Sequence, residues 1–187
     1  MIILIHQNAQ QVVKVLKGES EIKISATRCT EAFWELAEIF PEEIIGWCED
    51  KYCAKLNLAE WSNIFHQDLI MASYAVENTF LPESIGYIDQ LPFVNVNRKV
   101  LYPTWQMSGD VGGIKGGTLL KFKSLFEGID EFDYLLNSVA KIGQQNGLFC
   151  YSAPGLVNHI SDKKPESTAT SSQLFSFVYS YYNTIWL

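Results

Sequence analysis

The sequence predicts an α/β fold in which helices flank a mixed β-sheet and one further helix follows at the C-terminal end. Short apolar runs typical of buried strands recur at residues 2–5, 44–48 and 148–151. Between them lie segments whose apolar residues recur every three or four positions, at residues 30–40, 58–74 and 132–145. This alternation of strands and helices is typical of an α/β domain.

Composition limits the class of protein. The 187 residues suit one domain, and 48% hydrophobic against 19% charged residues is a globular composition. The net charge of -7, without a basic run, argues against a nucleic-acid partner. The apolar run at residues 2–5 is too short for a signal peptide, and no stretch reaches the roughly 20 apolar residues of a membrane span. We therefore expect a cytoplasmic protein.

The first elements follow from simple patterns. Residues 2–5 predict a strand, and alternating residues on either side of Lys17–Ser20 predict a hairpin over 12–16 and 21–25. Thr30 is a suitable cap for a helix that runs to Phe40, where Pro41 ends it.

The middle of the chain predicts a strand at 44–48, ending on Glu49-Asp50, and a helix over 58–74. Residues 75–110 are punctuated by prolines and predict irregular structure, with an edge strand at 93–97. Residues 110–117 hold four glycines and predict a turn, after which Thr118 begins a short helix.

The last part of the chain predicts the clearest helix. It begins after Asp130, presents Phe132, Leu135, Leu136 and Val139 on one face, and ends at Asn146-Gly147. A strand at 148–151 follows. We expect an α/β domain over 1–160, a polar linker over 161–172, and a C-terminal helix over 173–187 that continues into a further region of the same protein.

The four cysteines form no Cys-x-x-Cys pair and have no histidine at the spacing of a zinc site. Cys48 and Cys150 lie in apolar, strand-like runs. Buried free thiols in a reducing cytosol are therefore expected.

Polar side chains follow two of the predicted strands. His6-Gln7-Asn8 comes after the first, and Glu49-Asp50 comes after the strand at 44–48. Side chains at the carboxyl ends of strands face the crevice in which α/β folds bind ligands. Two adjacent carboxylates there suit a divalent cation that bridges a diphosphate. The alternative is that both segments are solvated loop starts.

A second group of candidates lies around the glycines. Gly112 and Gly113 would allow a ligand to approach the backbone closely. Glu131 and Asp133 stand in the first turn of the clearest helix, where a carboxylate near a ligand hydroxyl would serve as a general base. The helix dipole alone also favours carboxylates at that position.

The segment from Trp105 to Leu156 resembles the second half of a family 2 glycosyltransferase of the GT-A type. The resemblance rests on Gly112-Gly113, on Glu131-Phe132-Asp133 at a helix start, and on the apolar strand from Gly147 to Tyr151. The strand at 2–5, with its polar end, resembles the start of the same fold. The chain is similar to the N-terminal region of longer bacterial enzymes of this family. It departs from them in lacking Asp-x-Asp and in having its acidic pair split by Phe132.

The resemblance implies transfer of a sugar from a nucleotide-sugar to a carbohydrate acceptor. Asp133 and Glu131 would be the catalytic residues, and Glu49 and Asp50 would hold Mg²⁺ or Mn²⁺. Substrate binding would fall to six residues: His6, Gln7, Asn8, Asp110, Gly112 and Gly113. Two other functions stay open. The departures suit a non-catalytic interaction or regulatory module attached to a catalytic domain, and the 13% aromatic content suits a carbohydrate-binding domain.

Overall fold

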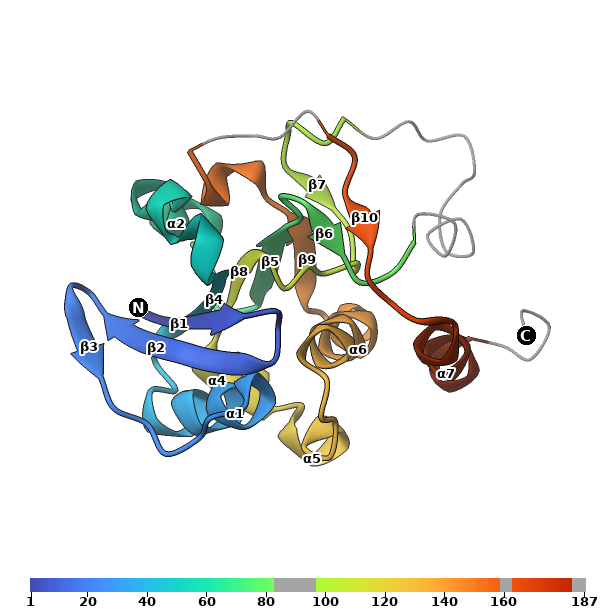
Figure 1. Ribbon diagram of the computed structural model, residues 1–187, viewed down its shortest axis with the longest axis horizontal. Helices are drawn as coiled ribbons and strands as arrows, with labels where there is room; N and C mark the ends of the chain where they lie inside the picture. Colours follow the sequence, from blue (N-terminus) through green and yellow to red (C-terminus); the bar gives the residue numbers. More distant parts are fainter. Residues whose placement is uncertain (83–96, 159–162, 183–187) are drawn as a thin grey trace.

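The computed structural model describes residues 1–82, 97–158 and 163–182, and within them it confirms an α/β fold with a mixed sheet and a C-terminal helix (Figure 1). The main sheet has eight strands in the order β3-β2-β1-β4-β8-β5-β9-β7. Its strands are β1 (Ile2–Gln7), β2 (Gln11–Lys17), β3 (Ser20–Ile22), β4 (Ile44–Glu49), β5 (Ile70–Tyr74), β7 (Tyr102–Pro103), β8 (Val111–Lys115) and β9 (Phe149–Ser152). A second, two-stranded sheet pairs β6 (Asn78–Thr79) with β10 (Glu166–Ser167).

The helices lie on both faces of the main sheet (Figure 1). They are α1 (Cys29–Ile39), α2 (Leu58–Ile64), α4 (Gly116–Leu120), α5 (Lys123–Phe126), α6 (Phe132–Gln145) and α7 (Ser171–Tyr181), with the 3₁₀ helices η1 (Asp50–Lys55) and η2 (Pro154–Leu156). Successive side chains of β1 point to opposite faces, so Ile2 and Leu4 join the core under α1 and α6, and Ile3 and Ile5 join the core on the α2 face. This burial on both faces explains the continuous apolar run at 2–5.

The strand directions bring several chain segments to one edge of the sheet. β1 pairs with β4 in parallel, β5 pairs with β9 in parallel, and β8 runs antiparallel between β4 and β5. The carboxyl ends of β1, β4, β5 and β9 therefore share an edge with the beginning of β8. We call this the polar edge, because His6, Glu49 and Asp110 all lie along it.

Several sequence predictions are confirmed. The hairpin is β2–β3, the helix over 30–40 is α1, and the strand at 44–48 is β4. The helix after Asp130 is α6, and Gly147, just beyond it, has the positive φ of 88° that its predicted role requires. Residues 93–96 of the predicted edge strand lie outside the described residues.

The prediction of one helix over 58–74 is wrong. Helix α2 ends at Ile64, and Ile70–Tyr74 form β5, a central strand. Every residue of β5 is buried, so the strand shows none of the apolar–polar alternation that identifies a half-exposed strand.

The prediction of a glycine-rich turn is also wrong. Gly112 and Gly113 lie in the middle of β8, paired with β4 on one side and β5 on the other. A Cβ at residue 112 would collide with the Trp47 indole and would lie 2.7 Å from the carbonyl oxygen of Ala72. A Cβ at residue 113 would lie 2.9 Å from the Phe65 ring. The glycines therefore make room for aromatic side chains of the two cores.

The C-terminal part is more closely attached than a linker and a helix would be. Within the predicted linker, β10 pairs in parallel with β6. Helix α7 begins with a capping box between Thr170 and Gln173 and ends at Tyr181, and residues 183–187 of the predicted helix lie outside the described residues. Phe177 is buried and stacks on Trp105 with ring centroids 5.7 Å apart. No helix within the described ranges is long and apolar enough to cross a membrane.

Candidate functional site

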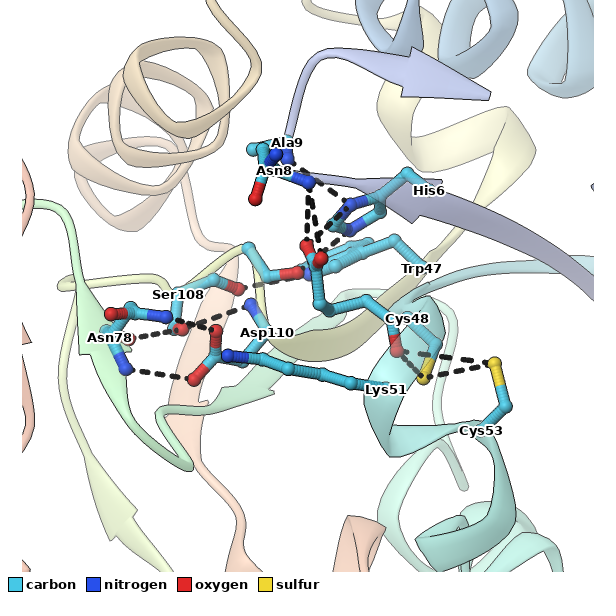
Figure 2. Close-up of polar contacts among 12 residues, drawn as sticks. His6, Asn8, Ala9, Trp47, Cys48, Lys51, Cys53, Asn78, Ser108 and Asp110 are labelled. Carbon is cyan, nitrogen blue, oxygen red and sulfur yellow. Dashed lines mark hydrogen bonds and ion pairs between the residues drawn. The ribbon is translucent and has the colours of Figure 1, made fainter. Parts of the chain in front are cut away.

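The polar edge carries a cluster of titratable side chains from β1, β4, η1, α6 and the residue before β8, most of which appear in Figure 2. A cavity of about 240 Å³ lies there, and His6, Glu49, Lys51, Asp110 and Asp133 are among its lining residues. A second cavity, of about 570 Å³, adjoins it. The two share five residues: Asn8, Ala9, Phe80, Asp133 and Thr168.

His6, the penultimate residue of β1, is fully buried and organises one side of the cluster. Its Nε2 lies 2.9 Å from the carbonyl oxygen of Gly109, which can only accept, so Nε2 carries a proton. Its Nδ1 lies 3.2 Å from Glu49 Oε2 and 3.3 Å from the backbone nitrogen of Ala9. The edge of the ring meets Phe132, the first residue of α6. His6 thus ties β1 to the ends of β4 and α6.

Glu49 holds the turn between β1 and β2. Its carboxylate accepts the backbone N–H of Asn8 at both oxygens, 2.9 and 3.1 Å away (Figure 2). Asn8 and Ala9 both have φ near +54°, a conformation that costs energy in non-glycine residues. Burial by itself raises the pKa of Glu49, but the bonds to His6 and Asn8 outweigh it and leave the pKa below its usual value.

Asp110 begins the approach to β8 and is almost completely buried, with 4% of its surface exposed. Its Oδ2 accepts the backbone N–H groups of Glu77 and Asn78 at 2.8 and 2.9 Å, and its Oδ1 accepts the Asn78 amide at 3.3 Å. Burial raises the pKa of Asp110, and these hydrogen bonds oppose that rise. Asp110 therefore holds the chain that follows β5.

Asp133 differs from these carboxylates. The residue is partly exposed, but its Oδ1 is inaccessible to solvent and has no hydrogen-bond partner among the described residues. Burial raises its pKa to about 6, the proximity of His6 and of the Gly109 backbone N–H opposes the rise, and the charges of Asp110 and Glu49 add to it. Gly109 makes this position possible, because a Cβ at residue 109 would collide with Oδ1.

The segment before Asp110 is fixed by hydrogen bonds from β4, β5 and α6. The carbonyl oxygen of Ser108 accepts the Trp47 indole N–H, and the backbone N–H of Ser108 donates to Ser73 Oγ on β5. Asn137 of α6 accepts the N–H of Met107 and donates to its carbonyl oxygen. Gly109 is thereby held between His6 and Asp133.

The structure brings together only some of the residues predicted for the site. His6, Asn8, Glu49, Asp110 and Asp133 line the smaller cavity. Glu131 lines the larger cavity, where its carboxylate accepts the Gln173 side chain of α7. Gln7 is exposed at the end of β1. Gly112 and Gly113 are buried in β8 against aromatic rings.

The predicted pair of metal ligands does not converge. Glu49 uses both oxygens on the Asn8 N–H, whereas Asp50 begins η1 and is exposed. Nowhere in the described part of the chain do three or more His, Cys, Asp or Glu side chains form a group that could hold a metal ion. Glu49 and Asp50 are not a preassembled cation site in this arrangement.

Seven lining residues of the smaller cavity were not foreseen from the sequence: Ala9, Lys51, Asn78, Thr79, Phe80, Gly109 and Thr168. Lys51 follows Glu49-Asp50 directly, so its position at the end of β4 was a usable signal. Gly109 is the neighbour of Asp110, a predicted site residue, and its position was a usable signal in the same way. Asn78 and Thr168 reach the site through the β6–β10 pair, for which the sequence holds no local signal.

The comparisons with known proteins add no family assignment. No protein-family model matches the chain, and none of the curated proteins searched matches it.

Proposed function

We propose that this domain transfers a glycosyl group from a nucleotide-sugar to a carbohydrate hydroxyl, with Asp133 as the general base. The observation that carries the proposal is the Asp133 carboxylate, which lines both cavities of the polar edge, has a pKa of about 6, and has an Oδ1 without a hydrogen-bond partner among the described residues. A buried, unpaired acceptor costs stability, so its presence in a cavity suits a ligand that supplies the missing donor.

Glycosyl transfer to a hydroxyl group requires a general base that removes the hydroxyl proton. The acceptor hydroxyl donates its proton to Asp133 as its oxygen bonds to the anomeric carbon of the donor sugar. The bond from that carbon to the diphosphate breaks at the same time, and the nucleoside diphosphate leaves. A base with a pKa near the working pH is present in its ionised form and still has appreciable proton affinity.

The surrounding space suits two substrates. The cavity of about 570 Å³ falls in the size range of small-molecule sites, and Asn8, Arg28 and Gln173 provide polar groups for a nucleotide-sugar. A third cavity, of about 270 Å³, meets the smaller cavity at Thr79. Ser73, Ser152 and Tyr102 contribute hydroxyl groups to it, which suits a polyhydroxylated acceptor.

The first test is calorimetric titration of the protein with uridine-diphosphate sugars, with and without Mn²⁺. We expect binding heat with at least one donor, and the two arms decide whether a cation takes part. Absence of heat with every donor in both arms would overturn the proposal for this chain.

The second test is the Asp133→Asn variant, assayed with the donor that binds. We expect donor binding to persist and turnover to fall by about 10²- to 10⁴-fold, the usual contribution of a general base. Asp130→Asn is the matched control, because Asp130 lines the larger cavity but is exposed and pairs with Arg28. Equal turnover in the Asp133 variant and the wild type would assign the base elsewhere.

A non-catalytic interaction module is the second candidate. It is supported by Phe175 and Tyr179, which lie one turn apart on α7 with 60% and 66% of their surfaces exposed. If the chain is such a module, the double variant Phe175→Ser with Tyr179→Ser would abolish its association with the catalytic domain, whereas Asp133→Asn would leave that association intact. Co-sedimentation of the chain with and without these changes separates the two cases.

A further inference from the structure

Cys48 and Cys53 form a pair of thiols at the end of β4, on the η1 side of the polar edge (Figure 2). Their sulfur atoms are 3.9 Å apart, and both lie near the carbonyl oxygen of Glu49, at 3.2 and 3.9 Å. A disulfide needs a sulfur–sulfur distance of about 2.05 Å, so an approach of roughly 2 Å separates this contact from a covalent bond. From this geometry we infer that Cys48 and Cys53 are a modification site that forms a reversible intrachain disulfide.

The fold restricts which thiols can pair. Cys48 belongs to the core on the α2 face of the sheet, and Cys53 packs against that core. Cys29 and Cys150 belong to the core on the opposite face. The sheet therefore separates the two groups, and Cys48 and Cys53 are each other's natural partner.

The two thiols also differ in access. Cys48 is fully buried, whereas Cys53 is only partly buried and is the one that a reagent from solvent meets first. The hydrogen bond shared with Cys48 lowers the pKa of Cys53, while the same bond and burial raise that of Cys48. Cys53 is thus the entry point, and Cys48 is the resolving thiol.

The reaction balances with a low-molecular-weight disulfide as the oxidant. The Cys53 thiolate attacks one sulfur of oxidised glutathione, and one glutathione thiolate leaves. Cys48 then loses its proton and attacks the Cys53 sulfur, which releases the second glutathione. Two protein thiols are oxidised to one disulfide, and one glutathione disulfide is reduced to two thiols.

Helix η1 can take up the movement. Cys48 is held in the ladder opposite Ile5 and Val111, so its backbone is fixed on both sides. Cys53 lies in a 3₁₀ helix, whose hydrogen bonds have poorer geometry than those of an α-helix. The same helix carries Lys51, which lines the smaller cavity and pairs with Glu77 at 2.9 Å. Closing the disulfide would therefore shift a cation of the candidate site.

The test treats the folded 187-residue chain with excess oxidised glutathione near pH 8, then denatures it and alkylates the remaining thiols. The reduced protein has four free cysteines, and we expect two alkylated thiols after treatment. The intact mass should fall by two hydrogens, and dithiothreitol should restore four thiols. Trypsin cleaves after Lys51, between the paired residues, so only a disulfide keeps the two fragments together.

Two variants make the result specific. Cys29→Ala with Cys150→Ala leaves only the proposed pair, and it should still lose both thiols. Cys53→Ser should keep all three of its remaining thiols under the same treatment. Circular dichroism verifies that each variant is folded. Four alkylated thiols in the treated wild type, a glutathione left on Cys53, or a disulfide with another partner would each overturn the inference.

Discussion

Asp110, which is buried, and Asp133, which is partly exposed but has a buried oxygen, line the same cavity, and their oxygens differ in what they contact. Asp110 accepts three hydrogen bonds, two of them from backbone N–H groups of the segment after β5. Asp133 leaves Oδ1 without a partner among the described residues. Both have a raised pKa caused first by burial, so the pKa direction alone does not distinguish them.

This difference indicates that hydrogen-bond donors, more than burial, distinguish a carboxylate that holds the fold from a candidate catalytic one. A carboxylate whose lone pairs are filled by backbone N–H groups is committed to holding the fold. A carboxylate with a buried oxygen that accepts no hydrogen bond destabilises the fold, unless a ligand supplies the missing donor. The comparison therefore makes opposite predictions for the stability of variants at the two positions.

The largest expected effect is at Asp110. Asp110→Ala leaves the N–H groups of Glu77 and Asn78 without an acceptor, so we expect a loss of about 3 kcal/mol in the free energy of unfolding. Urea denaturation at pH 7 measures it. Asp130→Ala is the control, because Asp130 is exposed and its ion pair with Arg28 contributes about 0.5 kcal/mol or less. A loss no larger than in the control would mean that the Asp110 carboxylate does not hold the fold in this way.

Asp133→Asn should act in the opposite direction. The pKa of Asp133 is raised from 3.8 to about 6, so ionisation penalises the folded state. The penalty is absent below the unfolded pKa, grows between the two pKa values and is complete above about pH 6. We expect the variant to be more stable than the wild type by on the order of 2 kcal/mol at pH 7.5, with little difference near pH 3.5. A loss of stability at pH 7.5 would mean that the Asp133 carboxylate, like that of Asp110, stabilises the folded state.

The smallest expected change in the free energy of unfolding is at Glu49, a third carboxylate of the same cavity. Its oxygens have partners, and its pKa is lowered, so its contribution to stability is present above its unfolded pKa and is lost as the pH falls through the folded value. Glu49→Gln keeps one acceptor oxygen for the Asn8 N–H and should cost about 1 kcal/mol at pH 7. The cost should shrink towards pH 3. A cost independent of pH would mean that shape rather than charge holds the turn.

The fold could be predicted wherever local patterns coincide with tertiary structure. The hairpin of β2 and β3, helix α1 and helix α6 all show the period of their element on one exposed or half-exposed face. β5 shows no such period, because it is buried on both faces. β8 holds two adjacent glycines, and it becomes a central strand because Trp47 and Phe65 fill the space that side chains would otherwise need. That signal lies in residues distant in the sequence.

In the candidate site, too, prediction from the sequence succeeds only where a local pattern marks the residue. His6, Asn8 and Glu49 could be predicted because polar residues directly follow apolar strands. The role of Asp110 could not, since its partners lie more than 30 residues earlier in the chain. Asp133 was predicted from its place at a helix start. The isolation of its Oδ1 from hydrogen-bond donors in the described part of the chain, however, depends on Gly109 and on the packing of α6 against β1.

The short strand β10 gives the cavities an order of assembly during synthesis. Ser167 lines the cavity of about 270 Å³, and Thr168, just beyond the strand, lines the other two. The nascent chain can form the main sheet once Ser152 has left the ribosome, because β9 is the last strand of that sheet in the sequence. All three cavities still lack a wall at that stage. The cavities therefore reach their full lining only when β10 pairs with β6, after the last strand of the main sheet has been synthesised.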